Sequence, residues 1–257
     1  MEKINLTWWD GKTIKNWGDA LNPILAGRIS KKEITYIPLN DKSENTRVSM
    51  IGSILNSIDT NNLIIWGSGF IADTNTLKKK PKEICAVRGK LTRNLLLKQG
   101  YNCPEIYGDP ALLYPKYYFP KINKKYKLGI IPHYIDANNI WLNQFKNSDE
   151  ILIINILDDI NSVVDKILSC EKIISSSLHG IIAADSYNIP SLWVEFSDKV
   201  IGKGFKFHDY FSSVKRKDTE SIKISKETTL ASIEKVIYDY KIDIDLEKLY
   251  NSCPFKK

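Results

Sequence analysis

The sequence predicts an α/β protein built on parallel sheets. Apolar runs of strand length alternate along the 257 residues with segments of helical spacing. The stretch 171–196 contains a strand, a tight turn, a helix and a strand in succession, which is the unit that builds a parallel sheet. Strands followed by glycine, serine or charged residues occur in both halves. We therefore expect two Rossmann-like domains that face each other across a cleft.

Composition favours a globular protein of the cytoplasm. Apolar residues make up 43% and charged residues 26% of the chain. The first ten residues are too polar for a signal peptide, and the longest apolar runs are only strand-sized. The four cysteines form no CxxC pair, which favours reduced thiols and argues against a zinc site.

The net charge of +7 suits an anionic partner. Lysines concentrate at 78–82 and 121–127, which we interpret as solvated loops rather than as a nucleic-acid groove. The basic excess also fits peripheral contact with an anionic inner membrane leaflet. We expect no nucleic acid as a partner.

The first half, 1–119, contains most of the expected strands. We expect strands at 4–9, 34–38, 48–51, 63–66 and 83–87, a further strand that ends near Tyr107, a helix that starts near Asp19 and runs through Ala26, and a helix at 90–98 closed by Gly100. Asp19 is explained by helix capping alone. However, Asn16, Gly18 and Asn22 surround it at the carboxyl end of the first strand, where open α/β sheets bind ligands.

Two further features of this half point to a site. I-G-S-I (51–54) and W-G-S-G-F (66–70) each place Gly-Ser after a strand, where a backbone can approach a ligand closely. They are not a dinucleotide fingerprint, because the third glycine is missing. Arg88 stands where a strand meets a helix. It is either a surface arginine paired with a carboxylate or a guanidinium fork for a carboxylate or phosphate.

The second half begins after an irregular linker at 115–126, so we place the domain boundary between residues 119 and 120. We expect strands at 128–134, 151–157, 172–174 and 189–196, helices at 137–145, 163–170, 178–187, 231–240 and 246–252, and an aromatic loop at 203–211 that closes over a site. Ser175, Ser176 and Ser177 precede the helix that carries His179. A helix start with free N–H groups favours an anion, and the imidazole stands beside it.

Five motifs in a fixed order resemble the polysaccharide pyruvyltransferase family. They are N-W-G-D-A-L-N-P (16–23), W-G-S-G-F (66–70), A-V-R-G-K-L-T-R (86–93), Y-G-D-P-A-L-L (107–113) and S-S-S-L-H-G-I-I-A-A-D-S-Y-N-I-P (175–190). The resemblance implies a fold similar to GT-B glycosyltransferases, with phosphoenolpyruvate as donor. We expect no cofactor and no metal, because ketal formation does not require a metal and no His, Asp or Glu cluster has metal-ligand spacing. The resemblance implies as acceptor a sugar of a bacterial surface polysaccharide or of its lipid-linked precursor, which receives a cyclic pyruvate ketal.

The resemblance also implies roles for named residues. Arg88 and His179 contact the donor, and Asp19 is the family's N-terminal aspartate. Several members carry arginine where this chain has Ser177, so the donor phosphate depends more on backbone N–H groups, on Arg88, or on Lys203 or Lys206. The expected donor site is Arg88, Ser175, Ser176, Ser177, His179, Gly180, Lys203 and Lys206, and the expected acceptor site is Asn16, Asp19, Asn22, Gly67, Ser68 and His133.

Ketal formation requires one general acid and one general base. We expect His179 to be the acid, or a ligand of the leaving phosphate, and Asp19 to be the base on the acceptor hydroxyl. The alternative is a nucleotide-sugar glycosyltransferase of similar fold, in which Glu195 reads the ribose hydroxyls. A third reading is a non-catalytic glycan-binding module, but it leaves Arg88 and His179 without a purpose.

Overall fold

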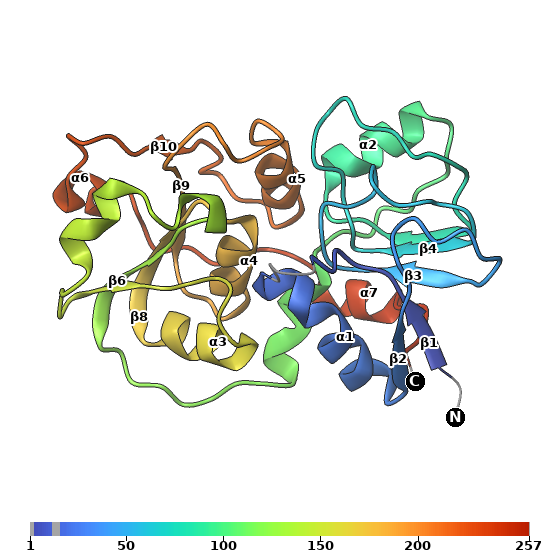
Figure 1. Cartoon of the computed structure of the whole chain (residues 1–257), viewed down its shortest axis with the longest axis horizontal. Helices are drawn as coiled ribbons and strands as arrows, with labels where there is room; N and C mark the ends of the chain where they lie inside the picture. The colour runs from blue at the N-terminus through green and yellow to red at the C-terminus, as the bar shows by residue number, and fades with distance from the viewer. Residues whose placement is uncertain (1–2, 12–15, 257) are drawn as a thin grey trace.

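The computed structural model describes residues 3–11 and 16–256 and contains two five-stranded sheets (Figure 1). The first sheet has the order β2-β1-β3-β4-β5 and the second β10-β9-β8-β6-β7. Every pairing between these strands is parallel. The strands are β1 (Lys3–Leu6), β2 (Glu33–Tyr36), β3 (Arg47–Ser49), β4 (Leu63–Trp66), β5 (Glu83–Ala86), β6 (Tyr126–Ile131), β7 (Ile151–Ile153), β8 (Cys170–Ser175), β9 (Ser191–Glu195) and β10 (Ile222–Lys223). The predicted α/β class is confirmed.

The two sheets share one strand order. When the strands of each half are numbered along the chain, both sheets read 2-1-3-4-5. In this order the connections leave the first and third strands in opposite directions, which opens a crevice at their carboxyl ends. The ends of β1 and β3, and those of β6 and β8, are therefore where this fold binds ligands.

Seven α-helices and three 3₁₀-helices cover the sheets in the described part of the chain. The α-helices are α1 (Trp17–Ser30), α2 (Lys90–Lys98), α3 (Ile160–Leu168), α4 (Leu178–Ser186), α5 (Phe205–Ser213), α6 (Leu230–Glu234) and α7 (Leu246–Asn251), and the 3₁₀-helices are η1 (Pro110–Lys116), η2 (Tyr134–Asp136) and η3 (Ile140–Phe145). α1 and α4 contact each other between the two sheets (Figure 1).

The hydrophobic core continues from one half into the other. One cluster of buried side chains contains Leu6 and Trp66 of the first sheet together with Ile131 and Ile173 of the second. The final helix returns to the first half, because Trp66 Nε1 donates to the carbonyl of Leu249 in α7 at 3.0 Å. The domain boundary between residues 119 and 120 stays a prediction. It assigns α7 to the second half, but α7 packs against the first half.

Two local predictions near the site are wrong. The cap of α1 is Asn16, whose side-chain oxygen accepts from the N–H groups of Gly18 and Asp19, so Asp19 already lies in the first turn. The segment expected as an aromatic loop forms α5, which begins after Gly204. Phe207 and Phe211 are spaced i, i+4 and both pack near Trp193, and this helical spacing buries the aromatic face.

Smaller differences concern element type and length. Tyr107 makes only an isolated bridge with Val87 instead of ending a strand. The helix expected at 137–145 is 3₁₀ over its last six residues, and the helix expected at 231–240 reduces to the short α6. η1 occupies the start of the expected linker, and the two-residue β10 has too few residues to show a period.

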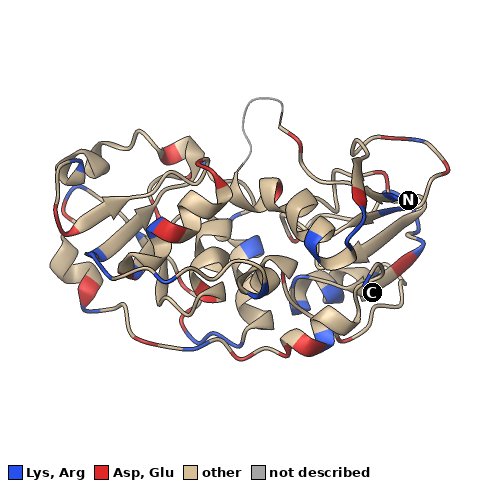
Figure 2. Ribbon diagram, turned by 90° about the horizontal axis from the view of Figure 1, so that it is seen from below, with Lys and Arg blue, Asp and Glu red and all other residues tan. Residues whose placement is uncertain are grey.

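No helix among the described residues is long and apolar enough to cross a membrane. Basic and acidic positions are scattered over both halves of the ribbon in Figure 2.

Candidate functional site

A pocket of about 320 Å³ lies at the carboxyl ends of β1, β3, β6 and β8. These are the crevice positions of both sheets. Its walls come from both halves of the chain: Trp9, Asn16, Asp19, Ser53, Ile54, Asn56, Ser57, Ile71, His133, Tyr134, Ile135, Ser177, Leu178, His179, Ile201 and Lys206. The structure thus brings together six of the predicted site residues: Asn16, Asp19, His133, Ser177, His179 and Lys206.

Asn16 joins the two halves in the wall of this pocket. Its Oδ1 accepts from the backbone N–H groups of Gly18 and Asp19, at 3.1 and 3.2 Å, and its Nδ2 donates to Asp19 Oδ2. These contacts fix the orientation of the amide. His179 Nδ1 lies 2.6 Å from the same Oδ1, an atom that can only accept. His179 therefore carries its proton on Nδ1, which leaves Nε2 with a free lone pair.

Gly18 permits this meeting of α1 and α4. A Cβ at position 18 would lie 2.4 Å from atoms of the His179 imidazole, closer than any real contact. The glycine of the N-W-G-D motif is therefore explained by the approach of the two helix starts.

Burial controls the protonation of the pocket. It raises the pKa of Asp19 to about 7, against the lowering effects of the Asn16 hydrogen bond and of Lys206. It lowers the pKa of His179 to about 3, and the positive charges of Lys206 and Arg88 add to this. Burial, together with Lys206, also lowers the pKa of His133 to about 4. Near neutral pH both histidines are thus uncharged, while a large fraction of Asp19 is protonated.

Lys206 is the pocket's positive charge. It belongs to α5, is only 8% exposed, and its ammonium has no hydrogen-bond acceptor among the residues that the structure describes. Burial, followed by the charge of Arg88, lowers its pKa to about 8, so it remains mostly protonated at neutral pH. A largely buried lysine whose ammonium has no hydrogen-bond acceptor, and only the charge of Asp19 and the Phe207 ring near it, favours an anionic ligand.

Arg88 lies behind the pocket wall and is fully buried. Its guanidinium donates to Asp209 Oδ2 at 2.9 Å, to the carbonyl of Phe70 at 2.6 Å, and to Ser53 Oγ. The alternative of a surface arginine is therefore wrong, although Arg88 does pair with a carboxylate, that of the buried Asp209 in α5. Arg88 meets the pocket through Ser53, and its direct contact with a donor stays a prediction.

The serine turn is built mainly from its own hydrogen bonds. Ser175 Oγ donates to the carbonyl of Ile131 at 2.8 Å and accepts from the N–H of Ser177 at 3.0 Å. Ser176 Oγ accepts from the N–H of His133 at 2.8 Å. An added Cβ at Gly180 would lie 2.4 Å from Ser175 Oγ, so this glycine serves packing. Of the serines and Gly180, Ser177 alone lines the pocket.

Four more predicted residues lie outside the pocket. Asn22 is buried, and its amide binds the carbonyls of Gly18, Asp19 and Ile51. Gly67 has a φ of +96°, and a Cβ there would lie 2.2 Å from Pro110 Cδ. Ser68 is buried beside it. Lys203 lines a separate cavity of about 420 Å³ with Trp193 and Glu195.

Sequence reasoning missed several lining residues. Ser53 belongs to I-G-S-I, the first of the two Gly-Ser turns, and it lines the pocket, whereas Ser68 of the second turn does not. Trp9 was assigned to a strand, and Asp209 had no signal because it meets Arg88 from 121 positions away. The described residues contain no cluster of three or more His, Cys, Asp or Glu side chains that could hold a metal.

Comparisons with known proteins show the family of this chain. The family model described as polysaccharide pyruvyl transferase matches residues 18–198. Protein L143 of Acanthamoeba polyphaga mimivirus is 35% identical over 204 residues, which are 77% of this chain and 70% of that protein. The succinoglycan biosynthesis protein ExoV of Rhizobium meliloti (strain 1021) is 32% identical over 174 residues, 62% of this chain and 51% of that protein. This chain therefore spans about half the length of ExoV. The chain belongs to the polysaccharide pyruvyl transferase family.

Proposed function

We propose that this chain transfers pyruvate from phosphoenolpyruvate to a sugar of a surface polysaccharide or of its lipid-linked precursor, and forms a cyclic ketal. One observation carries the proposal: the unpaired ammonium of Lys206 shares a pocket with His179 and with the start of α4. Phosphoenolpyruvate carries a phosphate and a carboxylate, which need such a cation and helix N–H groups. The family and the name of ExoV support a role in polysaccharide synthesis.

We further propose that the two halves act as GT-B-like domains, with the pocket in the cleft between them. The shared strand order and the origin of the lining residues in both halves support this arrangement. In this proposal the enzyme works in the cytoplasm, at the inner face of the membrane where its acceptor is lipid-linked.

The chemistry requires two bonds from C2 of the donor to acceptor oxygens. Protonation of C3 leaves positive character at C2, and a first sugar hydroxyl attacks there and loses its proton. The C2–O bond to phosphate then breaks, and a second hydroxyl closes the ring. Of the two hydroxyl protons released, one replaces the proton delivered to C3 and the other leaves with phosphate.

The protonation states of the free protein favour Asp19 as the acid, and His179 acts as the base once the negative charge of the bound donor raises its pKa from about 3. This reverses the roles expected from the sequence. Asp19 has a pKa of about 7 and holds a proton that it can deliver, whereas His179 Nε2 has a free lone pair. A bound donor adds negative charge, which raises the pKa of Asp19 further and keeps its proton in place.

Mass spectrometry of candidate acceptors incubated with enzyme and phosphoenolpyruvate tests the function. The expected result is a mass gain of one pyruvate less one water, with release of one phosphate. Consumption of a nucleotide sugar without use of phosphoenolpyruvate would establish the alternative glycosyltransferase instead. The feature that favours this alternative is the second cavity, which is lined by Glu195 and Lys203.

A further inference from the structure

The outer end of the pocket differs from its charged inner end. Trp9 is 50% exposed, and Ile135 and Ile201 are 40% and 65% exposed, yet all three line the pocket. The other five tryptophans of the chain are buried. An exposed indole at the mouth of a polar pocket is a surface on which a ligand can lie.

The backbone after β1 points Trp9 outward. Thr7 continues the sheet, since its N–H donates to the carbonyl of Val48 at 2.9 Å. Trp8 turns inward and packs against Tyr36 with ring centroids 4.5 Å apart. Alternation along an extended backbone then places the Trp9 indole on the opposite side.

Polar groups on the turn after β3 also line this pocket. Asn56 Nδ2 donates to Ser57 Oγ at 3.2 Å. Asn56 and Ser57 both line the pocket and are partly exposed, so a ligand in the pocket can contact their polar side chains.

We propose, on the basis of the proposed function, that Trp9, Asn56 and Ser57 form the acceptor subsite, and that its ligand is a hexopyranose ring of a glycan. A pyranose has an apolar C–H face, which matches the indole, and a rim of hydroxyls, which match the amide and the serine. A ring held there presents two hydroxyls toward Asp19 and His179. An acyl chain fits less well, because Asn56 and Ser57 interrupt the apolar rim.

Acrylamide quenching of tryptophan fluorescence tests this binding without any turnover. Because Trp9 is the exposed indole, it dominates the quenchable signal, and Trp9→Phe supplies the baseline. The probes are methyl β-glucopyranoside, methyl β-galactopyranoside and oligosaccharides from acid-hydrolysed succinoglycan, alongside phosphoenolpyruvate and phosphatidylglycerol vesicles. We expect at least one sugar to reduce quenching roughly twofold, since the indole loses one face to the ring. Phosphoenolpyruvate, bound at the inner end, leaves quenching unchanged.

Steady-state kinetics of Trp9 variants are the second test of the acceptor subsite. Trp9→Ala is expected to raise the acceptor KM about tenfold with the donor KM unchanged, and Trp9→Phe to restore part of the loss. Phe119→Ala is the matched control, since Phe119 is a 64% exposed aromatic outside the pocket.

Shielding of the Trp9 indole by vesicles alone, or by no sugar of the panel, overturns the subsite. Pyruvylation with an unchanged acceptor KM in Trp9→Ala also overturns it but leaves the proposed function standing. Sugar shielding without use of phosphoenolpyruvate supports the subsite and contradicts the donor.

Discussion

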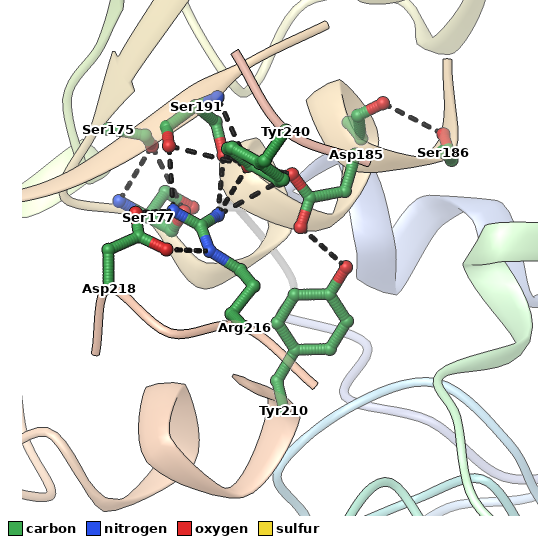
Figure 3. A network of polar contacts seen from close by, with 10 residues as sticks. Ser175, Ser177, Asp185, Ser186, Ser191, Tyr210, Arg216, Asp218 and Tyr240 are labelled. Carbon is green, nitrogen blue, oxygen red and sulfur yellow. Dashed lines mark hydrogen bonds and ion pairs between the residues drawn. The ribbon is translucent and has the colours of Figure 1, made fainter. Parts of the chain in front are cut away.

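Two buried clusters of charge in this molecule differ in how completely their groups are paired. One surrounds Arg216 and Asp185 in the second half (Figure 3), and the other surrounds Lys206 and Asp19 in the pocket. Both contain a cation and a carboxylate removed from bulk water. The first has hydrogen-bond partners for both of its charged groups, whereas in the second Asp19 accepts from Asn16 but Lys206 has no hydrogen-bond acceptor among the described residues.

The Arg216 cluster is saturated with hydrogen bonds. Arg216 donates to Ser191 Oγ at 2.9 Å, to the carbonyl of Ser191 at 2.7 Å, and to both oxygens of Asp218. Asp185 accepts from Tyr210, Ser191 and Tyr240. Asp185 also ends α4, whose other end carries His179, so this network anchors the helix of the site.

The charged groups of the pocket cluster have fewer hydrogen bonds. Lys206 has no hydrogen-bond acceptor in the described part of the chain, and Asp19 has the Asn16 amide beside it. Burial without compensation costs free energy. The difference indicates that the first cluster stabilises the fold and that the second is suited to bind a ligand.

The largest expected effect comes from breaking the saturated cluster. Arg216→Ala leaves Asp185 buried without its cation, and we expect a loss of about 3–5 kcal/mol in the free energy of unfolding, measured in urea. Lys215→Ala is the control, because its ion pair with Asp243 is exposed and contributes little. Similar losses for the two variants would show that the network is not a structural anchor.

Asp19→Asn tests the open cluster through pH. The folded-state pKa of about 7 lies above the unfolded value of 3.8, so the folded protein binds the extra proton between these pH values. Stability from this group is therefore lost as pH rises from about 4 to about 7. We expect Asp19→Asn to match the wild type near pH 4 and to exceed its stability by roughly 4 kcal/mol above pH 7.

The measurement is the melting curve across this range, with the exposed Asp73→Asn as control. A stability difference that does not change with pH would mean that Asp19 is ionised in the fold like an ordinary surface carboxylate.

His179→Gln tests catalysis at the same cluster. Glutamine can keep the hydrogen bond to Asn16 but cannot accept a hydroxyl proton, so we expect kcat to fall roughly 10²-fold while phosphoenolpyruvate still binds. His208→Gln is the control, since His208 packs edge-on against Trp193 outside the pocket. Near wild-type turnover in His179→Gln would remove it from proton transfer and leave His133, which does line the pocket, as the candidate.

Much of the fold could be predicted from the sequence because local spacing determines it. The bounds of β4 and α2 agree with those expected, since a short apolar run and a closing Gly100 mark them. Asp19, Ser177 and His179 line one pocket, in line with the cleft expected between the two halves: Asp19 follows β1 of the first sheet, and the other two follow β8 of the second.

The features of the fold and site that could not be predicted depend on contacts between distant parts of the chain. Gly52 and Gly67 occupy similar motifs, but Pro110 packs against the second and excludes it from the pocket. The site of Arg88 depends on Asp209, and a local pattern cannot reveal a partner in another helix. Lys203 and Lys206 were equivalent in the sequence, and the helix start at Phe205 directs them to different cavities.

Binding of phosphoenolpyruvate to two matched variants, Lys206→Met and Lys203→Met, tests the central claim most directly. Both lose one lysine charge within four positions of each other, but only Lys206 lines the pocket. By titration calorimetry we expect Lys203→Met to bind like the wild type and Lys206→Met to bind at least about tenfold more weakly, as for a lost charge-assisted hydrogen bond. Equal affinity in the two variants, or no binding of phosphoenolpyruvate by the wild type, would contradict the account.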